Sequence, residues 1–170
     1  MSKASRPQYS DRIVADYLRR SYTAVDGLWF VKVEEAEDFG TALELDRQVW
    51  EVMPKIQARR ARALLDIDGD AAGDLAACFG LKLEADGHEY QVIVDDTRVR
   101  ARVHRCLWLE NMRRSGREHL ATQIGEHVCT AEGRVWAEEF GGCYEFSLPC
   151  RRCGGDTFCE FLFVCRGQRE

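Results

Sequence analysis

Long apolar runs and blocks rich in lysine or arginine are both missing from this 170-residue sequence. No stretch approaches the roughly 20 apolar residues that span a bilayer. The first 20 residues, MSKASRPQYSDRIVADYLRR, lack the continuous apolar segment of a secretory signal. The formal net charge is −5, whereas nucleic-acid-binding proteins usually carry a strongly basic face. We therefore expect a cytoplasmic protein with neither a membrane nor a nucleic acid as a partner.

Short catalytic signatures are also absent. The sequence has no Gly-x-Ser-x-Gly, no His-Glu-x-x-His, no P-loop and no Rossmann fingerprint. It has one Cys-x-x-Cys motif and no second one, no internal repeat and no low-complexity segment. The function must therefore be sought in residues that no short motif reveals.

The first half of the sequence has helical periodicity. Ser10 can cap a helix whose apolar residues return every three or four positions, and Gly40 is expected to end it. Thr41 and Glu44 form a capping-box pattern that opens a second helix. Pro54 lies inside this second pattern and is expected to kink it. The two helices form the expected N-terminal helical pair, and a short third helix should follow.

The second half contains strand patterns. Residues 88–96 and 98–108 alternate between apolar and polar residues and predict a β-hairpin. A helix is expected over 117–139, and a second hairpin over 143–150 and 157–165. Helices followed by antiparallel strands are typical of an α+β protein.

The length and the 45% hydrophobic content fit one domain over residues 1–170. We predict a helical N-terminal part over 8–65 and a cysteine-rich α+β part over 86–165, in which antiparallel strands pack against helices. The long amphipathic N-terminal helices could also pair two copies into a homodimer.

Eight cysteines are many for a protein expected in a reducing compartment, where disulfides are rare. A chain of this size needs no crosslinks for ordinary stability. We therefore expect metal-binding or reactive thiols and no disulfide framework. Cys143 and Cys165 lie far along their strands from the turn that joins them, and we expect both to be free thiols in the core or at an edge.

The Cys-x-x-Cys motif is followed by two glycines, which suit a backbone that wraps round a metal-bound sulfur. Strand alternation places Cys150 and Cys159 on one face of the hairpin, near its turn. The fourth ligand could come from an earlier strand or from the long helix. The candidate metal ligands are therefore Cys106, Cys129, Cys150, Cys153 and Cys159. Zn²⁺ is the expected metal and an iron–sulfur cluster the alternative; buried unligated thiols or a redox dithiol are the other interpretations.

Two tryptophans stand beside charged residues on the predicted helices. They could form the aromatic walls of a pocket whose cationic groups suit a small carboxylate-bearing ligand. Alternatively, the tryptophans join pairs of helices and the charges form solvated ion pairs. The candidate substrate-binding residues are Trp29, Lys32, Glu35, Trp50, Lys55, Gln57 and Arg59.

A family resemblance covers most of residues 17–62 and 98–163. Its segments are YLRRSYTAVDGLWFVKVEEAEDFG (17–40) with its continuation FGTALELDRQVWEVMPKIQARR (39–60), RVHRCLW (102–108), LPCRRC (148–153) and GDTFCEF (155–161). The chain resembles a family of largely uncharacterised prokaryotic proteins similar to L-2-aminothiazoline-4-carboxylate hydrolases, which open a thiazoline ring to give N-carbamoylcysteine. The last segment also resembles 4-vinyl-reductase-type ligand-binding domains. The resemblance implies Cys106, Cys150, Cys153 and Cys159 as framework positions, and it would place a further cysteine near Thr122.

These observations lead to one functional expectation with two forms. The protein is expected to bind a metal, with zinc first, and a small carboxylate-bearing molecule. As an enzyme it would hydrolyse a C–N bond in a small heterocycle or amide, which requires an open position on the metal. The alternative is a non-catalytic ligand-binding or sensor domain in which a closed cysteine site stabilises the fold.

Overall fold

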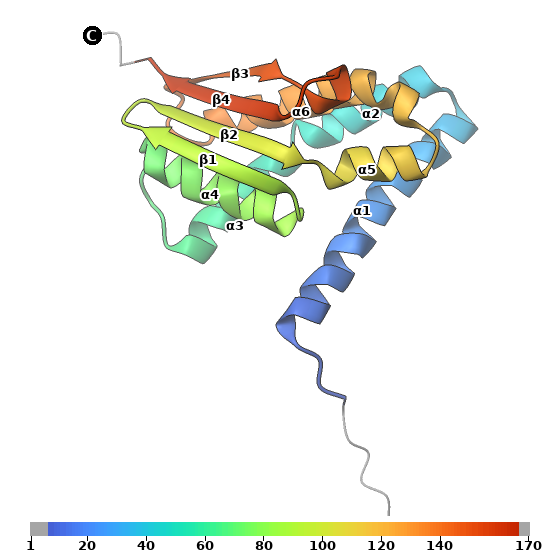
Figure 1. Cartoon of the computed structure of the whole chain (residues 1–170), viewed down its shortest axis with the longest axis horizontal. Coiled ribbons are helices and arrows are strands. Elements are labelled where there is room, and N and C mark those ends of the chain that lie inside the picture. Colours follow the sequence, from blue (N-terminus) through green and yellow to red (C-terminus); the bar gives the residue numbers. More distant parts are fainter. Residues whose placement is uncertain (1–6, 167–170) are drawn as a thin grey trace, which may run out of the picture.

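The computed structural model describes residues 7–166. Helices precede a four-stranded antiparallel sheet, which confirms the predicted α+β class (Figure 1). The helices of the first half are α1 (Asp11–Ala36), α2 (Phe39–Trp50), α3 (Met53–Leu65) and α4 (Ala72–Ala85). The second half comprises β1 (Glu89–Asp95), β2 (Arg98–Arg105), α5 (Leu107–Arg114), the 3-10 helix η1 (Glu118–Leu120), α6 (Ala121–Glu138), β3 (Tyr144–Cys150), the 3-10 helix η2 (Arg152–Gly154) and β4 (Cys159–Cys165). None of the helices within 7–166 combines the length and apolar character needed to cross a membrane.

Two hairpins build the sheet, as the alternating patterns predicted. β1 pairs with β2 and β3 pairs with β4, while pairing of β2 with β4 joins the hairpins in the order β1-β2-β4-β3. Helices α4 and α6 cover one face of the sheet, and α3 packs against both of them (Figure 1). The core therefore lies between this sheet face and the helices.

Aromatic rings fill the centre of that core. The ring of Phe79 on α4 lies 5.2 Å from that of Trp136 and 5.3 Å from those of Phe161 and Phe163, measured between centroids. The contacts with Trp136 and Phe163 are edge-to-face and that with Phe161 is tilted, and such ring contacts add to the hydrophobic gain from burying large rings. A Cβ at Gly133 of α6 would overlap the ring of Phe146, so glycine lets α6 approach β3 closely.

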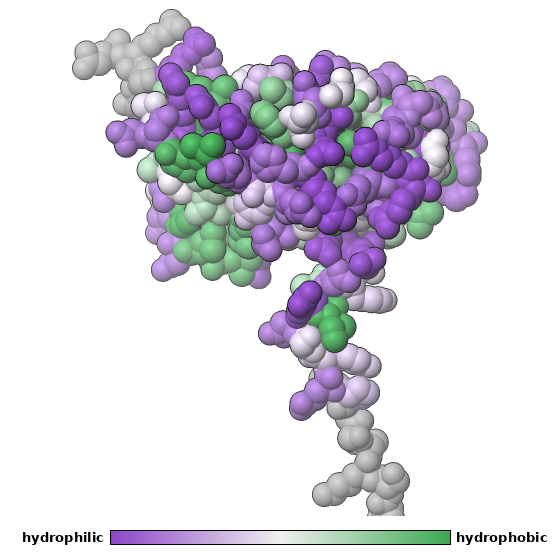
Figure 2. Space-filling view, in the orientation of Figure 1, coloured by the Kyte–Doolittle hydropathy of each residue, from purple (hydrophilic) through white to green (hydrophobic). Residues whose placement is uncertain are grey.

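Helix α1 is attached to the body by its C-terminal part only. Ser10 caps it by accepting a hydrogen bond from the backbone N–H of Ile13. Phe30 packs with Leu43 of α2 and Ile124 of α6 in a second buried cluster. The N-terminal part extends away from the body (Figure 1) and carries exposed hydrophobic side chains (Figure 2).

Helix boundaries differ from the prediction at two places. Pro54 does not kink a continuous helix: α2 ends at Trp50, and Pro54 lies in the first turn of α3, where its missing N–H costs no hydrogen bond. Asp38 rather than Gly40 marks the boundary between α1 and α2, because its carboxylate accepts a hydrogen bond from the Thr41 N–H. Helix α5 was not predicted, since its eight residues follow a strand without a turn signal.

The expectation that Cys143 and Cys165 are free thiols is wrong. The two form a disulfide across the end of the β3–β4 pair, with their Cα atoms 5.0 Å apart. Strands β3 and β4 are antiparallel, and Tyr144, next to Cys143, lies opposite Cys165. The start of one strand and the end of the other therefore lie side by side.

The expectation that Cys150 and Cys159 share a face is also wrong. Between Ser147 and Cys150 the register of β3 against β4 shifts, so Cys150 lies opposite Glu160. A shift of one residue moves a side chain to the other face of a sheet. Pro149 lies in this irregular stretch, and a proline cannot donate a ladder hydrogen bond.

Candidate functional site

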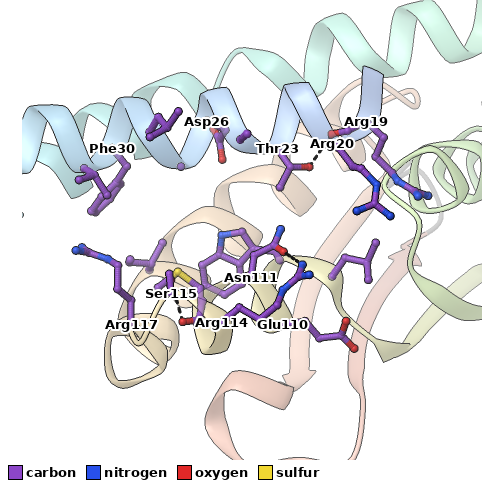
Figure 3. Close-up of a pocket in the computed structure, with 18 of the residues that line it drawn as sticks. Arg19, Arg20, Thr23, Asp26, Phe30, Glu110, Asn111, Arg114, Ser115 and Arg117 are labelled. Atoms are coloured by element: carbon purple, nitrogen blue, oxygen red, sulfur yellow. Dashed lines mark hydrogen bonds between the residues drawn. The ribbon is translucent and has the colours of Figure 1, made fainter. Parts of the chain in front are cut away.

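A cleft of about 690 Å³ lies between α1 and α5, and we call it the outer cleft (Figure 3). The phenyl ring of Phe30 points into it from α1, and Trp108, Met112 and Ile124 contribute further apolar surface. Its volume falls in the range of small-molecule sites, which are usually concave and mostly apolar.

Five arginines line the outer cleft and give it a basic rim. Figure 3 shows side chains of α1 and of the α5 region approaching the cleft from two sides. Several arginines are held by carboxylates outside or at the edge of the cleft. The arginines are Arg19, Arg20, Arg105, Arg114 and Arg117, and the pairs include Arg20 with Asp16 (2.8 Å), Arg105 with Glu110 (2.6 Å) and Arg117 with Glu34 (2.5 Å). Such planar donors suit carboxylate or phosphate groups.

A smaller cavity of about 110 Å³, which we call the inner pocket, adjoins the outer cleft. Side chains from α4, α6, β2 and β4 line it, together with parts of α1 and α2. The residues that line both spaces are Thr23, Asp26, Asp46, Leu107 and Trp108. The two cavities therefore lie side by side and share these residues as lining.

A buried ion pair stands in the wall of the inner pocket. The Nζ atom of Lys82 lies 2.6 Å from Oε1 of Glu132 and 3.0 Å from Oδ2 of Asp86. Lys82 and Glu132 are only 8% and 3% exposed. Burial lowers the pKa of Lys82, but the two carboxylates raise it more, so the ammonium stays charged.

Two carboxyl groups stand at the junction of the cavities. Burial raises the pKa of Asp46 to about 7, and the nearby Asp26 carboxylate adds to the rise. Burial likewise raises the pKa of Asp26, with a contribution from Asp86. The junction therefore carries less negative charge at neutral pH than two ordinary aspartates would.

His88 is the neutral base of the inner pocket. Burial and the Lys82 ammonium lower the pKa of His88 to about 4. Its Nδ1 atom accepts a hydrogen bond from the Leu107 N–H at 3.3 Å. The neutral ring must then carry its proton on Nε2, which makes that atom a hydrogen-bond donor.

Thiols form another side of the inner pocket. Cys106 follows β2, Cys129 lies on α6 and Cys159 begins β4, and all three line the cavity. Burial raises the pKa of Cys129, and the neighbouring Cys106 and Cys159 add to that rise. Burial also raises the pKa of Cys159 to about 11, although the Arg152 N–H donates to its sulfur at 3.2 Å. These thiols are therefore protonated at neutral pH in the protein alone.

Cys153 lies beside this group without lining the pocket. Its sulfur is 3.0 Å from the position that a Cβ on Gly125 would occupy, so glycine leaves room for η2 against α6. Burial raises the pKa of the Cys153 thiol, and Gly125, which its sulfur approaches, lines the inner pocket. Thr122, where the family resemblance would place a cysteine, donates a hydrogen bond to the Cys153 carbonyl.

The structure thus brings four of the five predicted metal-binding cysteines together and leaves Cys150 on the other face of the sheet. In the structure of residues 7–166, no group of three or more Cys, His, Asp or Glu side chains is arranged to hold a metal ion. Metal binding would require these thiols to move closer together.

The predicted substrate-binding residues scatter. Trp50 lines the inner pocket, whereas Trp29 lines a separate shallow groove with Val49 and Ile56. The remaining residues line neither the outer cleft nor the inner pocket. Lys32 pairs with Glu35 (2.5 Å), Lys55 and Arg59 both approach Glu139 (3.9 and 2.8 Å), and the Gln57 Oε1 atom is buried.

Sequence reasoning missed the arginine rim and the charged inner wall. One signal was available: Lys82 interrupts the apolar stretch LAACFGLKL at 75–83, where an exposed lysine would be out of place. Glu132 and His88 gave no such signal, because neither of them interrupts an apolar run.

Comparison with known proteins gives a family but no described function. No curated protein and no solved structure matches the chain. The family match carries no link to aminothiazoline carboxylate hydrolases or to 4-vinyl-reductase-type domains. Over residues 3–162 the chain belongs to DUF6125, a family of unknown function.

Proposed function

We propose that the protein binds a small, acidic organic molecule in the outer cleft, with the uncharged end of that molecule directed toward the inner pocket. The observation that carries this proposal is that a cleft lined by five arginines adjoins a buried polar pocket, with five lining residues in common. Binding sites commonly combine an apolar wall with a few convergent polar groups in this way.

The charges favour an anion at the rim. Arg114 donates to its neighbour Asn111, and Arg20 is held by a single carboxylate, so both can turn to a ligand at little cost. The apolar wall, with the indole of Trp108 at its centre, suits a ring or a short chain on the same molecule.

A second candidate activity is metal-dependent hydrolysis of a C–N bond at the thiols. It is supported by the three thiols that face the inner pocket while Cys153 stands aside. Zn²⁺ held by three thiolates would keep an open position toward the ligand, where a bound water could act as nucleophile. Coordination by all four thiols would close the site, and the protein would then be a ligand-binding or sensor domain with a structural metal.

Ligand binding is tested on the native protein. Mass spectrometry under native conditions should detect a co-purified acid, and titration with small aromatic and heterocyclic carboxylates should change the tryptophan fluorescence, to which Trp108 contributes. The double variant Arg20→Gln/Arg114→Gln should weaken binding about tenfold or more. Arg98→Gln, on the exposed face of β2, is the matched control and should bind normally. Equal affinity of both variants would contradict the proposal.

Metal binding is tested separately by elemental analysis and X-ray absorption. Cys106→Ser, Cys129→Ser and Cys159→Ser should each lose the metal, while Cys150→Ser should keep it. Three sulfurs and one oxygen at the ion would favour hydrolysis, and four sulfurs would favour a structural role. A metal-free native protein would refute the metal proposal and leave the ligand proposal standing.

A further inference from the structure

The outward side of α1 carries a stripe of large hydrophobic residues that nothing within residues 7–166 covers. We call it the outer stripe: Val14, Tyr17, Leu18, Val25, Leu28 and Trp29. Their exposed fractions run from 43% for Val14 to 71% for Tyr17. A helix normally turns such a stripe toward a core, with polar residues on the opposite side.

In α1 the other side of the helix is the one that meets the protein body. Thr23 and Asp26 line the two cavities, and Phe30 is buried against α2 and α6. The outer stripe therefore requires a second contact partner. The N-terminal part of α1 extends beyond the body (Figure 1), and short helices without tertiary packing are marginally stable in water.

We propose that a second copy of this chain covers the outer stripe, with the two α1 helices packed antiparallel. Val14, Leu18, Ser21, Val25 and Leu28 follow one another at intervals of four, three, four and three residues. This spacing is that of the hydrophobic seam of a coiled coil. The seam continues for two heptads. It begins in the part of α1 that projects from the body and ends in the part that contacts the body.

The stripe is complementary to itself in one antiparallel register. With Ser21 of one copy opposite Val25 of the other, Leu18 faces Leu28 and Tyr17 faces Trp29. Ser21 is small and lies near the centre, which lets the backbones approach. Every contact then occurs twice, as a two-fold symmetric interface requires.

In this register apolar residues of one copy meet apolar residues of the other, whereas Glu34 is already paired with Arg117 and Asp26 lines the two cavities. The self-complementary pattern therefore favours a second copy over an unrelated partner.

The area fits a stable dimer. Six large side chains, each about half exposed, offer on the order of 600 Å² of apolar surface per copy. Each partner of a standard interface contributes roughly 800 Å², so the outer stripe would supply most of the area that a stable dimer requires.

Sedimentation equilibrium on the full chain tests the proposal, since a dimer has twice the 19.5 kDa chain mass. Leu18→Glu should raise the dimer dissociation constant at least about 100-fold, because each interface would bury the charge twice. Leu28→Arg should do the same. The double variant Leu18→Glu/Leu28→Arg should restore most of the affinity, since the two positions face each other.

Leu64→Glu is the matched control, a leucine 61% exposed on α3, and should remain dimeric. Circular dichroism confirms that each variant is folded. A monomeric native protein at micromolar concentration overturns the proposal, and so does a dimer that Leu18→Glu leaves intact. Loss of dimer without recovery in the double variant overturns the register. A native protein that is monomeric and pellets with anionic lipid vesicles would show that the outer stripe binds a membrane surface, and this result would also overturn the proposal.

Discussion

Removing the buried ammonium of Lys82 should destabilise the protein far more than removing either of its carboxylate partners. The perturbation is Lys82→Met, which keeps the length of the side chain and deletes the charge. Glu132, 3% exposed, would then be a buried carboxylate without its partner at 2.6 Å, and Asp86 would lose its contact at 3.0 Å. Breaking a buried pair by removing one partner costs about 3–5 kcal/mol.

The reverse deletion leaves a partner behind. In Glu132→Gln the ammonium still has Asp86, so the expected cost is about 1–2 kcal/mol. The double variant Lys82→Met/Glu132→Gln should be more stable than Lys82→Met alone, because the uncompensated buried charge is gone. The cycle should therefore give a coupling of about 2 kcal/mol between the two residues.

Equilibrium unfolding in urea at pH 7, followed by circular dichroism, measures these differences. Lys55→Met is the control, since its ammonium is exposed and 3.9 Å from Glu139, and it should cost less than about 1 kcal/mol. Two results would contradict the prediction. One is a loss of unfolding free energy in Lys82→Met that is no larger than in Lys55→Met, and the other is a larger loss in Glu132→Gln than in Lys82→Met.

Two further predictions concern titration and covalent structure. Burial raises the pKa of Asp46 from 3.8 to about 7, so between these pH values the folded state holds a proton that the unfolded state has lost. The contribution of Asp46 to the free energy of unfolding is therefore fully present below pH 4 and is lost as the pH rises through 7. Asp46→Asn should raise the free energy of unfolding by about 2 kcal/mol at pH 8 but change it little at pH 4, as measured by urea unfolding at both pH values. The Cys143–Cys165 disulfide joins residues 22 positions apart, so Cys143→Ser/Cys165→Ser should lose about 3 kcal/mol. Thiol titration of the denatured protein should count six thiols before reduction and eight after it; eight from the start would contradict the disulfide.

Local patterns in the sequence were enough to predict most of the elements. The alternation over 88–96 and 98–108 and over 143–150 and 157–165 gave both hairpins, because side-chain direction in a strand has a period of two. The order of strands was not predictable in this way. Pairing of β2 with β4 joins residues about 60 positions apart, and no local pattern records it.

The candidate site shows the same limit more sharply. The sequence allowed four cysteines near the inner pocket to be named as candidate metal ligands, but not their positions relative to one another, because they lie in different parts of the fold. These cysteines are Cys106, Cys129, Cys153 and Cys159. Cys150 was misplaced because one irregularity near Pro149 reverses the side-chain direction that alternation predicts. Lys82 and Glu132 are 50 residues apart in sequence, so their contact depends entirely on how α4 and α6 pack on the sheet.

The distribution of charge through the two cavities sets the direction in which the proposed ligand can bind. The outer cleft has five arginines at its rim, whereas Lys82 is the one permanent cation among the described residues that line the inner pocket. That ammonium is already shared by Glu132 and Asp86, and Asp26 and Asp46 stand at the entrance. A carboxylate moved inward would leave the arginines and approach these acids, which is unfavourable in a pocket of low dielectric.

The same imbalance bears on the thiols. Three thiols line the inner pocket beside Glu132: Cys106, Cys129 and Cys159. Deprotonation of several of these thiols would add negative charge to a pocket that already has an excess of it. The thiols therefore either keep their protons or bind a cation together. A divalent ion would provide the missing positive charge and release the thiol protons together. The acidic end of a ligand therefore belongs at the rim, and its uncharged end is the part that can reach the thiols.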